Sequence, residues 1–386
     1  MKNTQNKITV IGMGYIGLPT ALLLAHQNRN IICIDNDKNK IKDFKIGRSF
    51  LKEKEINLLF KKKRKLLNFS EKIELSNTYI ICVPTPVKKY SKYLYKEDLS
   101  ILNSVFNNLE KILKKNDLVI IESTCPPETA LKFYNKIKKK FNFYLATCPE
   151  RAMPGNTINE MVNNYRVIGA SCKETFIKAK KLYQLFVKGK IYKTDLTEAE
   201  LIKLFENSYR DVNIGFANEI DTICKKYLID SKKIIKLTNF HPRVKIHEPG
   251  IGVGGHCIPV DPWFLIEKRN TRNNSIIYNS RISNLKKENE IYNNLSKILN
   301  KKAKILFFGT TYKKNTEDMR NSPAINLINR LIKVYSQVKI FDPINQSHNN
   351  IKLKKVKSTS FDMIIIFVKH DWLKKNKLKS KNIISL

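Results

Sequence analysis

The sequence predicts an α/β protein with a parallel sheet near each end of the chain and a helical segment between them. Three observations support this fold class. Short runs rich in β-branched residues alternate with apolar helical runs up to about residue 190, and the same alternation returns after residue 301. Between them, Thr197–Lys226 carries apolar residues at helical spacing and contains no proline. A chain of 386 residues with 42% hydrophobic residues is long and apolar enough for two or three cores.

The first part of the chain contains short, continuous apolar runs that are typical of buried parallel strands. An apolar helical run, Leu18–His26, lies between the first two of them. The predicted strands are Lys7–Ile11, Ile31–Ile34, Thr78–Val83, Asp117–Ile121 and Phe143–Thr147. Because strands that alternate with helices pair in parallel, we expect a doubly wound sheet here.

The alternation after residue 301 predicts a second, smaller α/β domain. Its strands are Lys304–Phe308, Val338–Phe341 and Met363–Val368, with a helix over Ala324–Val334. Since the chain stops soon after Asp371-Trp372, we expect the last strand and helix of this domain to be shortened. The predicted domains are residues 1–194, 195–300 and 301–386, of which the central one is helical.

The formal net charge of +38 comes mostly from lysines that are dispersed along the whole chain. Dispersed charge favours a drift in composition over a nucleic-acid-binding stripe, although polyanions should bind nonspecifically at low salt. The densest cluster, Lys61–Lys65, is expected at a solvated helix end. We therefore predict no specific nucleic-acid partner.

Cysteine usage and hydropathy indicate the compartment. Seven scattered cysteines without a C-x-x-C pair suggest neither a disulfide framework nor a zinc site, and they fit a reducing cytosol. No run approaches the ~18 apolar residues that a membrane span needs, and the polar residues 1–7 lack the apolar core of a signal peptide. We expect a cytoplasmic protein with no membrane partner.

Gly12-Met13-Gly14-Tyr15-Ile16-Gly17 is a G-x-G-x-x-G pattern that directly follows a strand and precedes an apolar helix. Asp35 ends the next strand, 18 residues after Gly17. In this context the pattern predicts a Rossmann-like dinucleotide site, in which Gly12 permits the turn, Gly14 lets the pyrophosphate approach and Gly17 lets the helix pack. Asp35 would bind the adenosine ribose hydroxyls and repel a 2′-phosphate, so NAD is the expected cofactor. The alternative is a glycine turn that only closes a βα unit.

Cys257 lies in a second unusual segment, Gly254-Gly255-His256-Cys257-Ile258-Pro259-Val260-Asp261. From these residues alone, Cys257 is either a nucleophile with Asp261 as an acid/base partner or a small buried residue in a turn. Adjacent residues usually point apart, so His256 is expected to stabilise the loop rather than to form a pair with Cys257. His241 and His247 are expected to be contacts in the same loop region.

The whole chain resembles the UDP-glucose/GDP-mannose dehydrogenase family, whose motifs occur here in order. They are GMGYIGLPTA from residue 12, VPTP at 83–86, ESTCPP at 122–127, CPERAMPG at 148–155, ELIKLFEN at 200–207, GVGGHCIPVDPW at 252–263 and FGTTYKKNTEDMRNSPA at 308–324. The stretches NSYRDVNIGFANE and HPRVKIHEPGIGVGGHC resemble the branch that acts on UDP-N-acetyl-D-mannosamine.

The resemblance implies oxidation of a UDP-sugar CH2OH group to a carboxylate by two hydride transfers, through a thiohemiacetal and a thioester on Cys257. Lys203 and Asn207 match the pair that stabilises oxyanion charge from one helix face. Asp261 matches a carboxylate that tunes Lys203 or activates water. Glu150 matches the general base of thioester hydrolysis, with Thr124 holding the water. How the proton steps divide among these groups stays open.

The resemblance also implies the binding residues. Thr85 and Thr124 would contact NAD beside Gly12, Gly14, Tyr15, Ile16, Gly17 and Asp35. The sugar nucleotide would contact Glu150, Arg151, Lys203, Asn207, Arg243, Gly254, Lys313 and Arg320. Arg243 would come from the neighbouring subunit of a homodimer, and for Arg320 a salt bridge within its own domain is equally natural.

Two positions depart from the family pattern, and three alternatives remain. Val260 stands where UDP-glucose dehydrogenases usually carry Lys, and Glu128 replaces a common Gly, so the next helix is expected to start at a shifted position. The first alternative is UDP-N-acetylglucosamine or UDP-glucose as substrate. The second is an ordinary two-electron dehydrogenase with a structural Cys257, and the third is a basic nucleic-acid-binding protein with a degenerate nucleotide fold. The complete set of candidate catalytic residues favours the four-electron oxidation.

Overall fold

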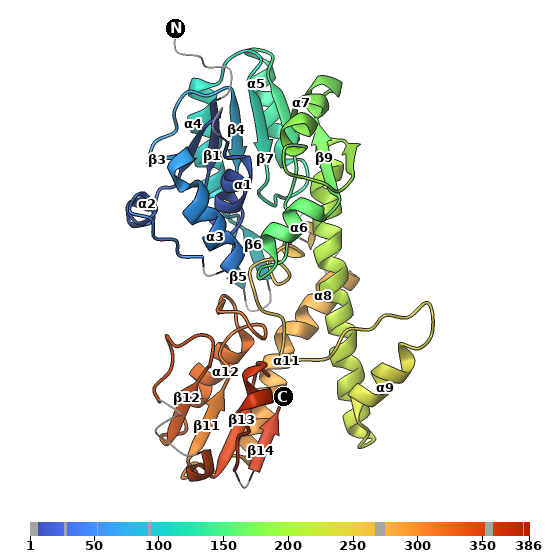
Figure 1. The fold of residues 1–386 in the computed structure, drawn as a ribbon. Helices are drawn as coiled ribbons and strands as arrows, with labels where there is room; N and C mark the ends of the chain where they lie inside the picture. Colours follow the sequence, from blue (N-terminus) through green and yellow to red (C-terminus); the bar gives the residue numbers. More distant parts are fainter. Residues whose placement is uncertain are drawn as a thin grey trace. The chain divides into compact units, whose positions relative to one another are not determined.

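The computed structural model describes residues 7–26, 29–51, 53–91, 94–266, 275–351, 358–380 and 382–386, so the polar start at residues 1–6 lies outside it. The chain forms two compact units (Figure 1). The first comprises Met1–Lys89 and Tyr95–Phe205, and the second comprises Tyr90–Leu94 and Glu206–Leu386. The division into three domains stays a prediction.

The first unit is built on one eight-stranded sheet with the order β10-β9-β8-β7-β4-β1-β2-β3. The strands are β1 (Lys7–Ile11), β2 (Asn30–Ile34), β3 (Leu67–Ser70), β4 (Thr78–Ile81), β7 (Leu118–Ile121), β8 (Tyr144–Thr147), β9 (Arg166–Ala170) and β10 (Ile191–Thr194). Neighbouring strands are parallel except β8 and β9, which are antiparallel. The predicted doubly wound sheet and its five strands are confirmed to within a few residues at each end.

Helices cover both faces of this sheet, because alternate strand residues point to opposite faces. Ile31 and Cys33 belong to the core that lies under α1 (Gly17–Leu24), α3 (Lys54–Lys63) and α7 (Lys173–Tyr183). Ile32 and Ile34 belong to the core under α4 (Ser100–Ile112) and α5 (Thr129–Lys138). The shorter helices α2 (Lys38–Lys45) and α6 (Thr157–Asn163), a 3-10 turn at Arg64–Leu66, and a two-stranded ribbon of β5 (Val87–Ser91) and β6 (Leu94–Glu97) complete the elements.

The lysine cluster and Glu128 both lie at helix ends in this unit. α3 ends at Lys63, as expected for the cluster, and Lys63 Nζ donates a hydrogen bond to the Leu22 carbonyl at 3.0 Å. Glu128 adopts a left-handed conformation with φ of 69°, and α5 begins at the next residue, Thr129. An L-residue is disfavoured in that conformation, which explains why the related pattern carries glycine there.

The predicted long helix is confirmed as α8 (Leu196–Lys226), 31 residues long, followed by α9 (Ser231–Thr238), α10 (Trp263–Ile266) and α11 (Ile276–Ile298). The boundary between the two units falls within α8, after Phe205. Within the described residues, no helix combines the length and the apolar character that crossing a membrane requires.

The second unit contains a four-stranded parallel sheet with the order β12-β11-β13-β14. Its strands are β11 (Ile305–Phe308), β12 (Val338–Phe341), β13 (Met363–Ile366) and β14 (Asn382–Ser385), with α12 (Pro323–Leu331), a 3-10 turn at Ser358–Ser360, and α13 (Trp372–Lys375). Leu327 and Leu331 of α12 share a core with Ile305 and Phe307, which confirms the smaller α/β domain. The position of the last strand, β14, was not predicted from the sequence; it has four residues and pairs with β13 at the sheet edge.

Candidate active site

The glycine turn between β1 and α1 has the geometry of an anion-binding loop. Gly12 has φ of +94°, and a Cβ there would lie 2.7 Å from the Cys82 carbonyl oxygen. A Cβ on Gly17 would lie 1.8 Å from the Gly12 oxygen, whereas Gly14 faces open space. Ile16 caps α1 without a side-chain hydrogen bond, and the first turn of the helix has no acidic residue. The open space at Gly14 and the positive dipole end of α1 therefore suit a pyrophosphate.

Asp35 follows β2 and is tied directly to this turn. Its Oδ2 accepts hydrogen bonds from the Met13 N–H at 2.9 Å and from Lys40 Nζ at 2.8 Å, and its Oδ1 accepts one from the Asp37 N–H at 3.0 Å. The carboxylate is thus fixed beside the loop, where ribose hydroxyls would lie. Lys40 of α2 was not singled out from the sequence, since it is one lysine among many.

Further candidates gather where neighbouring strands end. Thr85 follows β4 and Thr124 follows β7, and the Thr85 hydroxyl donates a hydrogen bond to the Thr124 carbonyl at 2.6 Å. Glu150 follows β8, the next strand in the sheet. In an open parallel sheet, ligands bind outside the carboxyl ends of the strands, and these residues lie there together with the glycine turn.

Glu150 is buried, and three donors hold its carboxylate. Oε1 accepts from the Arg151 and Ala152 N–H groups at 2.7 and 2.9 Å, and Oε2 accepts from Arg166 Nη2 at 2.5 Å. Burial alone would raise the pKa of Glu150, but the Arg166 charge and these hydrogen bonds outweigh it and hold the pKa below its usual value. Arg151 itself donates a side-chain hydrogen bond to the Tyr165 carbonyl at 3.2 Å.

Arg166 of β9 also faces a second carboxylate. Its Nη1 lies 3.5 Å from Oε1 of Glu122, and its guanidinium stacks over the Tyr183 ring with 4.4 Å to the centroid. Glu122 accepts hydrogen bonds from Tyr183 and Thr20, and burial raises its pKa despite Arg166. Sequence reasoning did not identify Arg166 or Glu122, because neither stands in a recognisable spacing with Glu150.

Asn207 and Asp261 meet in the second unit. The Asn207 amide donates a hydrogen bond to Asp261 Oδ2 at 2.6 Å, and both side chains are buried. Lys203 is also buried and precedes Asn207 by one turn of α8. The predicted spacing therefore places Lys203 and Asn207 on one face of the same helix.

Cys257 is half-buried, with its Sγ 3.8 Å from His256 Nδ1. The expectation that the two adjacent side chains point apart is wrong. The turn brings them together, because the Cys257 carbonyl accepts from the Val260 and Asp261 N–H groups at 2.9 and 2.8 Å and Gly255 has φ of +92°. What His256 contributes stays a prediction.

The glycines before Cys257 pack against the segment that follows β11. The Gly255 N–H donates to the Arg320 carbonyl at 2.9 Å, and the Asn321 amide donates to the Gly255 carbonyl at 2.8 Å. A Cβ on Gly254 would lie 2.6 Å from the Tyr312 Cβ. Burial raises the pKa of Tyr312 to about 12, with smaller contributions from Asp318 and from Cys257. This loop can therefore hold a thiol at a defined position.

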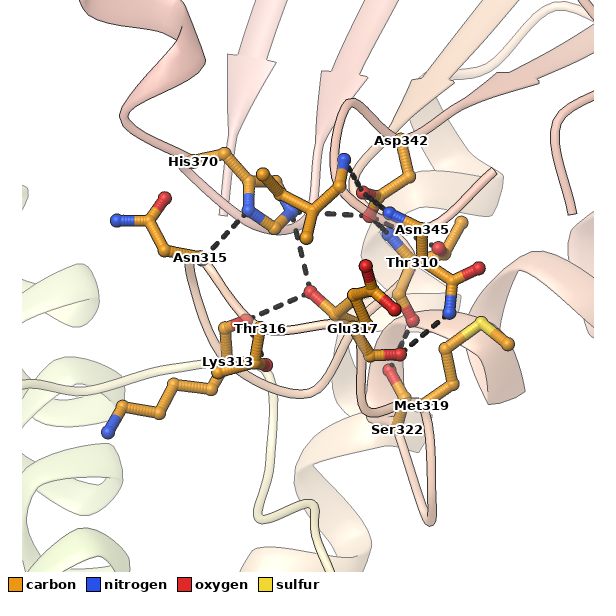
Figure 2. Close-up of polar contacts among 12 residues, drawn as sticks. Thr310, Lys313, Asn315, Thr316, Glu317, Met319, Ser322, Asp342, Asn345 and His370 are labelled. Carbon is orange, nitrogen blue, oxygen red and sulfur yellow. Dashed lines mark hydrogen bonds and ion pairs between the residues drawn. The ribbon is translucent and has the colours of Figure 1, made fainter. Parts of the chain in front are cut away.

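The other cationic candidates lie in loops of the second unit. Arg320 makes a two-point ion pair with Asp318, with Nε–Oδ1 at 2.9 Å and Nη2–Oδ2 at 2.5 Å, which is the salt bridge considered as its alternative role. Lys313 lies in the loop after β11 and extends away from the surrounding polar cluster (Figure 2). Arg243 is exposed, and its N–H donates to His241 Nδ1 at 3.3 Å. His247 is exposed, and its partial desolvation lowers its pKa, with a smaller contribution from Arg210.

A buried network braces the Cys257 loop from α8 and α11. Arg281 Nη1 lies 3.0 Å from Asp211 Oδ1 and 3.5 Å from the Ile258 carbonyl, and the Gly250 N–H donates to Asn218 at 2.9 Å. Burial raises the pKa of Asp211 to about 6 against the Arg281 charge. The sequence contained no local signal for this network.

Family models match almost the whole chain. The NAD-binding domain of the UDP-glucose/GDP-mannose dehydrogenase family matches residues 6–187, its central domain matches 197–288, and its UDP-binding domain matches 306–385.

Individual relatives agree with this match. The chain is 39% identical to a UDP-N-acetyl-D-mannosamine dehydrogenase of Methanococcus vannielii, over all of this chain (100%) and 91% of the relative. Its fold matches the UDP-D-ManNAc dehydrogenase of Pyrococcus horikoshii with a TM-score of 0.88 and 35% identity, over 98% of this chain and 94% of the other. A UDP-N-acetyl-mannosamine dehydrogenase of Staphylococcus aureus matches with a TM-score of 0.86 and 31% identity, over 98% of both chains.

Proposed function

The chain belongs to the UDP-glucose/GDP-mannose dehydrogenase family as an NAD-dependent enzyme of UDP-sugars, and we propose that it oxidises UDP-N-acetyl-D-mannosamine to UDP-N-acetyl-D-mannosaminuronate. The observation that carries the choice of sugar is the full-length similarity to relatives with that activity in their names. The reaction consumes one alcohol, two NAD and one water, and it yields the carboxylate, two NADH and three protons.

The proposed chemistry runs through Cys257. Each oxidation transfers a hydride from C6 to bound NAD, which is the chemistry that the cofactor supplies. After the first oxidation, the Cys257 thiolate adds to the aldehyde carbon, and the second oxidation converts this thiohemiacetal to a thioester. Water then adds to the thioester carbon and the thiolate leaves.

Two neighbouring groups suit the oxyanions of these steps. The Asn207 amide has two N–H bonds and uses one of them on Asp261, so the second remains for a developing oxyanion. Lys203 adds a cation from the same helix face, one turn earlier. Asp261 is thereby assigned to orienting Asn207, and Lys203 to oxyanion stabilisation.

Glu150 suits the hydrolytic water. An ionised carboxylate has about four lone-pair sites, and the Arg151 N–H, the Ala152 N–H and Arg166 occupy three of them. The remaining site is available for a water that Thr124 also contacts. In this proposal Glu150 removes a proton from that water as it attacks the thioester.

We expect Arg166→Gln to shift the pH dependence of uronate formation. The pKa of Glu150 is depressed, so the ionised base is lost as pH falls through that value; removing the Arg166 cation raises the pKa and moves the acid limb to higher pH by about one unit or more. The pH dependence of the single-turnover rate of thioester hydrolysis measures this shift. Arg166→Lys keeps a charge and should shift the limb less. An unchanged acid limb in Arg166→Gln would contradict the role of Arg166.

A panel of UDP- and GDP-sugars with NAD tests the substrate. We expect the highest kcat/KM with UDP-N-acetyl-D-mannosamine, measured as NADH formation. A higher kcat/KM with UDP-glucose or UDP-N-acetylglucosamine would show that the proposed substrate is wrong, while the proposed four-electron oxidation would stand. One NADH per sugar would instead indicate a two-electron dehydrogenase. Salt-sensitive DNA binding without any turnover would indicate the nucleic-acid alternative.

NAD should be used at least about tenfold better than NADP, equivalent to ~1.4 kcal/mol, because the buried Asp35 carboxylate repels a 2′-phosphate. Asp35→Ala should relax this preference, because it removes the anion and leaves Lys40 without its 2.8 Å partner. The ratio of kcat/KM for the two cofactors measures it. Equal use of both by the unmodified enzyme would overturn the assignment of Asp35.

We also propose a homodimer that forms through α8. Tyr209, Phe216 and Ile223 recur every seven residues along α8 and are 61, 51 and 47% exposed, and Tyr227, just after the helix, is 71% exposed. A stripe of large exposed apolar side chains is typical of a protein–protein interface. The exposed Arg243 would then reach the neighbouring subunit's sugar nucleotide.

A further inference from the structure

A buried polar cluster at the carboxyl end of the second sheet has no part in the chemistry above (Figure 2). Its centre is Asp342, which follows β12 and is fully buried. Oδ2 accepts from the Thr310 N–H at 2.6 Å and lies 3.2 Å from His370 Nε2. Oδ1 accepts from the Ile344 and Asn345 N–H groups at 2.8 and 2.9 Å. The carboxylate thus joins the segments that follow β11, β12 and β13.

The hydrogen bonds define the tautomer of His370, which is 2% exposed. Its Nδ1 accepts from the Asn315 N–H at 2.9 Å, and an acceptor nitrogen carries no proton. Its Nε2 therefore carries the proton and faces Asp342 Oδ2 at 3.2 Å, with Thr311 Oγ1 at 3.4 Å. The structure requires a neutral imidazole at this position.

This imidazole holds the loop that carries Lys313. Asn315 has a left-handed φ of 58°, and its N–H is the group that His370 binds. On either side of Asn315, the Thr311 and Thr316 hydroxyls donate to the Lys313 carbonyl at 2.9 and 3.0 Å. The backbone of Lys313 is therefore set by a turn that His370 holds at the Asn315 N–H. The Asn315 side chain adds two bonds to the neighbouring residue, donating to the Asp371 carboxylate at 2.6 Å and accepting from the Asp371 N–H at 3.0 Å.

We propose that neutral His370 positions the Lys313 loop for the UDP-sugar, and that protonation of His370 loosens the backbone of this loop and weakens UDP-sugar binding. This inference rests on the proposed function, because that function places Lys313 at the sugar nucleotide. His370 acts through Lys313 and is a positioning residue. When Nδ1 gains a proton, it faces the Asn315 N–H with a donor instead of an acceptor, and the turn loses that bond.

The charged neighbours of His370 favour a change in the Lys313 loop over movement of the protonated imidazole out of its buried position. Asp342 attracts an imidazolium, so the ring keeps its contact with the carboxylate when it is protonated. Burial would raise the pKa of Asp342, but the hydrogen bonds from His370, Thr310 and Asn345 hold it at about 2. Asp371 is exposed, pairs with Lys374 at 2.9 Å and bonds the Asn315 side chain, so the side chain of Asn315 stays anchored when its N–H loses the His370 acceptor.

Two substitutions separate the two ring nitrogens. His370→Asn places an amide oxygen near the Nδ1 position, where it can still accept from Asn315, and it removes the titratable ring. His370→Gln places an amide near Nε2, so it keeps the Asp342 contact and leaves the Asn315 N–H without its acceptor. His348→Asn is the matched control, since His348 is an exposed histidine of the same unit. Two readouts apply to the full-length protein: hydrogen-exchange protection of residues 310–317, and calorimetric affinity for UDP-N-acetyl-D-mannosamine without NAD.

The unmodified enzyme should lose protection of the Asn315 amide, and about fivefold to tenfold in affinity, between about pH 8 and pH 5.5. His370→Asn should keep the amide protection and the UDP-sugar affinity at every pH. His370→Gln should bind the UDP-sugar weakly at every pH, with a raised KM and a largely unchanged kcat. His348→Asn should show the same pH dependence as the unmodified enzyme. Identical pH dependence in the unmodified enzyme and His370→Asn would overturn the proposal. If exchange follows His370 as expected but no variant binds any UDP-sugar, the proposed function fails and the loop brace stands.

Discussion

Cys257→Ala is expected to abolish uronate formation, with a fall in kcat of several orders of magnitude. Without a thiolate no thiohemiacetal forms, so the aldehyde has no covalent intermediate from which the second hydride can leave. The half-buried Cys257 lies in a clamped turn, so the smaller side chain should leave the loop intact. The measurement is the yield of NADH and of uronic acid per sugar. Cys172→Ala is the matched control, since that cysteine contacts Thr175 at 3.2 Å and is not a candidate site residue.

Cys257→Ser gives a complementary result. It should carry out both oxidations once, through a hemiacetal, and then stall as an ester, because an alkoxide leaves far less readily than a thiolate. Mass spectrometry after incubation with UDP-sugar and NAD should show a protein adduct of about one sugar nucleotide. Two NADH per sugar at the unmodified rate in Cys257→Ala would rule out covalent catalysis and return Cys257 to a structural role in a glycine-lined turn.

The sequence predicted most of the strands whose residues are buried on both faces, and of the edge strands it predicted only β12 and missed β3, β10 and β14. Val10, Ile80 and Ile120 belong to continuous apolar runs, so β1, β4 and β7 were identified from local pattern alone. β10 and β14 are short, and most of their side chains are partly or fully exposed, so no apolar run marks them. β9 begins with Arg166, whose burial only its carboxylate partners explain.

The residues of the candidate site also fall into a group that the sequence predicted and a group that it missed. The glycine turn and Asp35 were predictable because each depends on a few adjacent residues and a known spacing. Arg166, Lys40 and the pair of Asp342 and His370 were not, because each acquires its partner from a separate strand or helix. Contacts of this kind leave no periodic signal in a single sequence. The orientation of His256 was misjudged because the turn after Gly255 overrides the usual alternation of neighbouring side chains.

The apolar stripe on α8 leads to the second large effect, loss of activity on dissociation. Phe216 is 51% exposed in the middle of the stripe, so Phe216→Glu places a charge where a partner helix would pack. We expect a monomer by light scattering and almost complete loss of turnover, because each site would then lack Arg243 from the other subunit. Lys225→Glu is a control on the same helix, since Lys225 is exposed and pairs with Asp221 at the same end of α8. This variant should remain a dimer.

Complementation distinguishes a shared site from a purely structural dimer. Arg243→Ala and Cys257→Ala should each be inactive as homodimers. In a heterodimer of the two, one site combines the intact Cys257 of one subunit with the intact Arg243 of the other, whereas the second site lacks both. Coexpression with random pairing makes half of the dimers mixed, so about a quarter of the unmodified activity should return. If Arg243 serves its own subunit, every site in the mixture lacks one residue and no activity returns. A fully active Phe216→Glu monomer would exclude the shared site by a separate route.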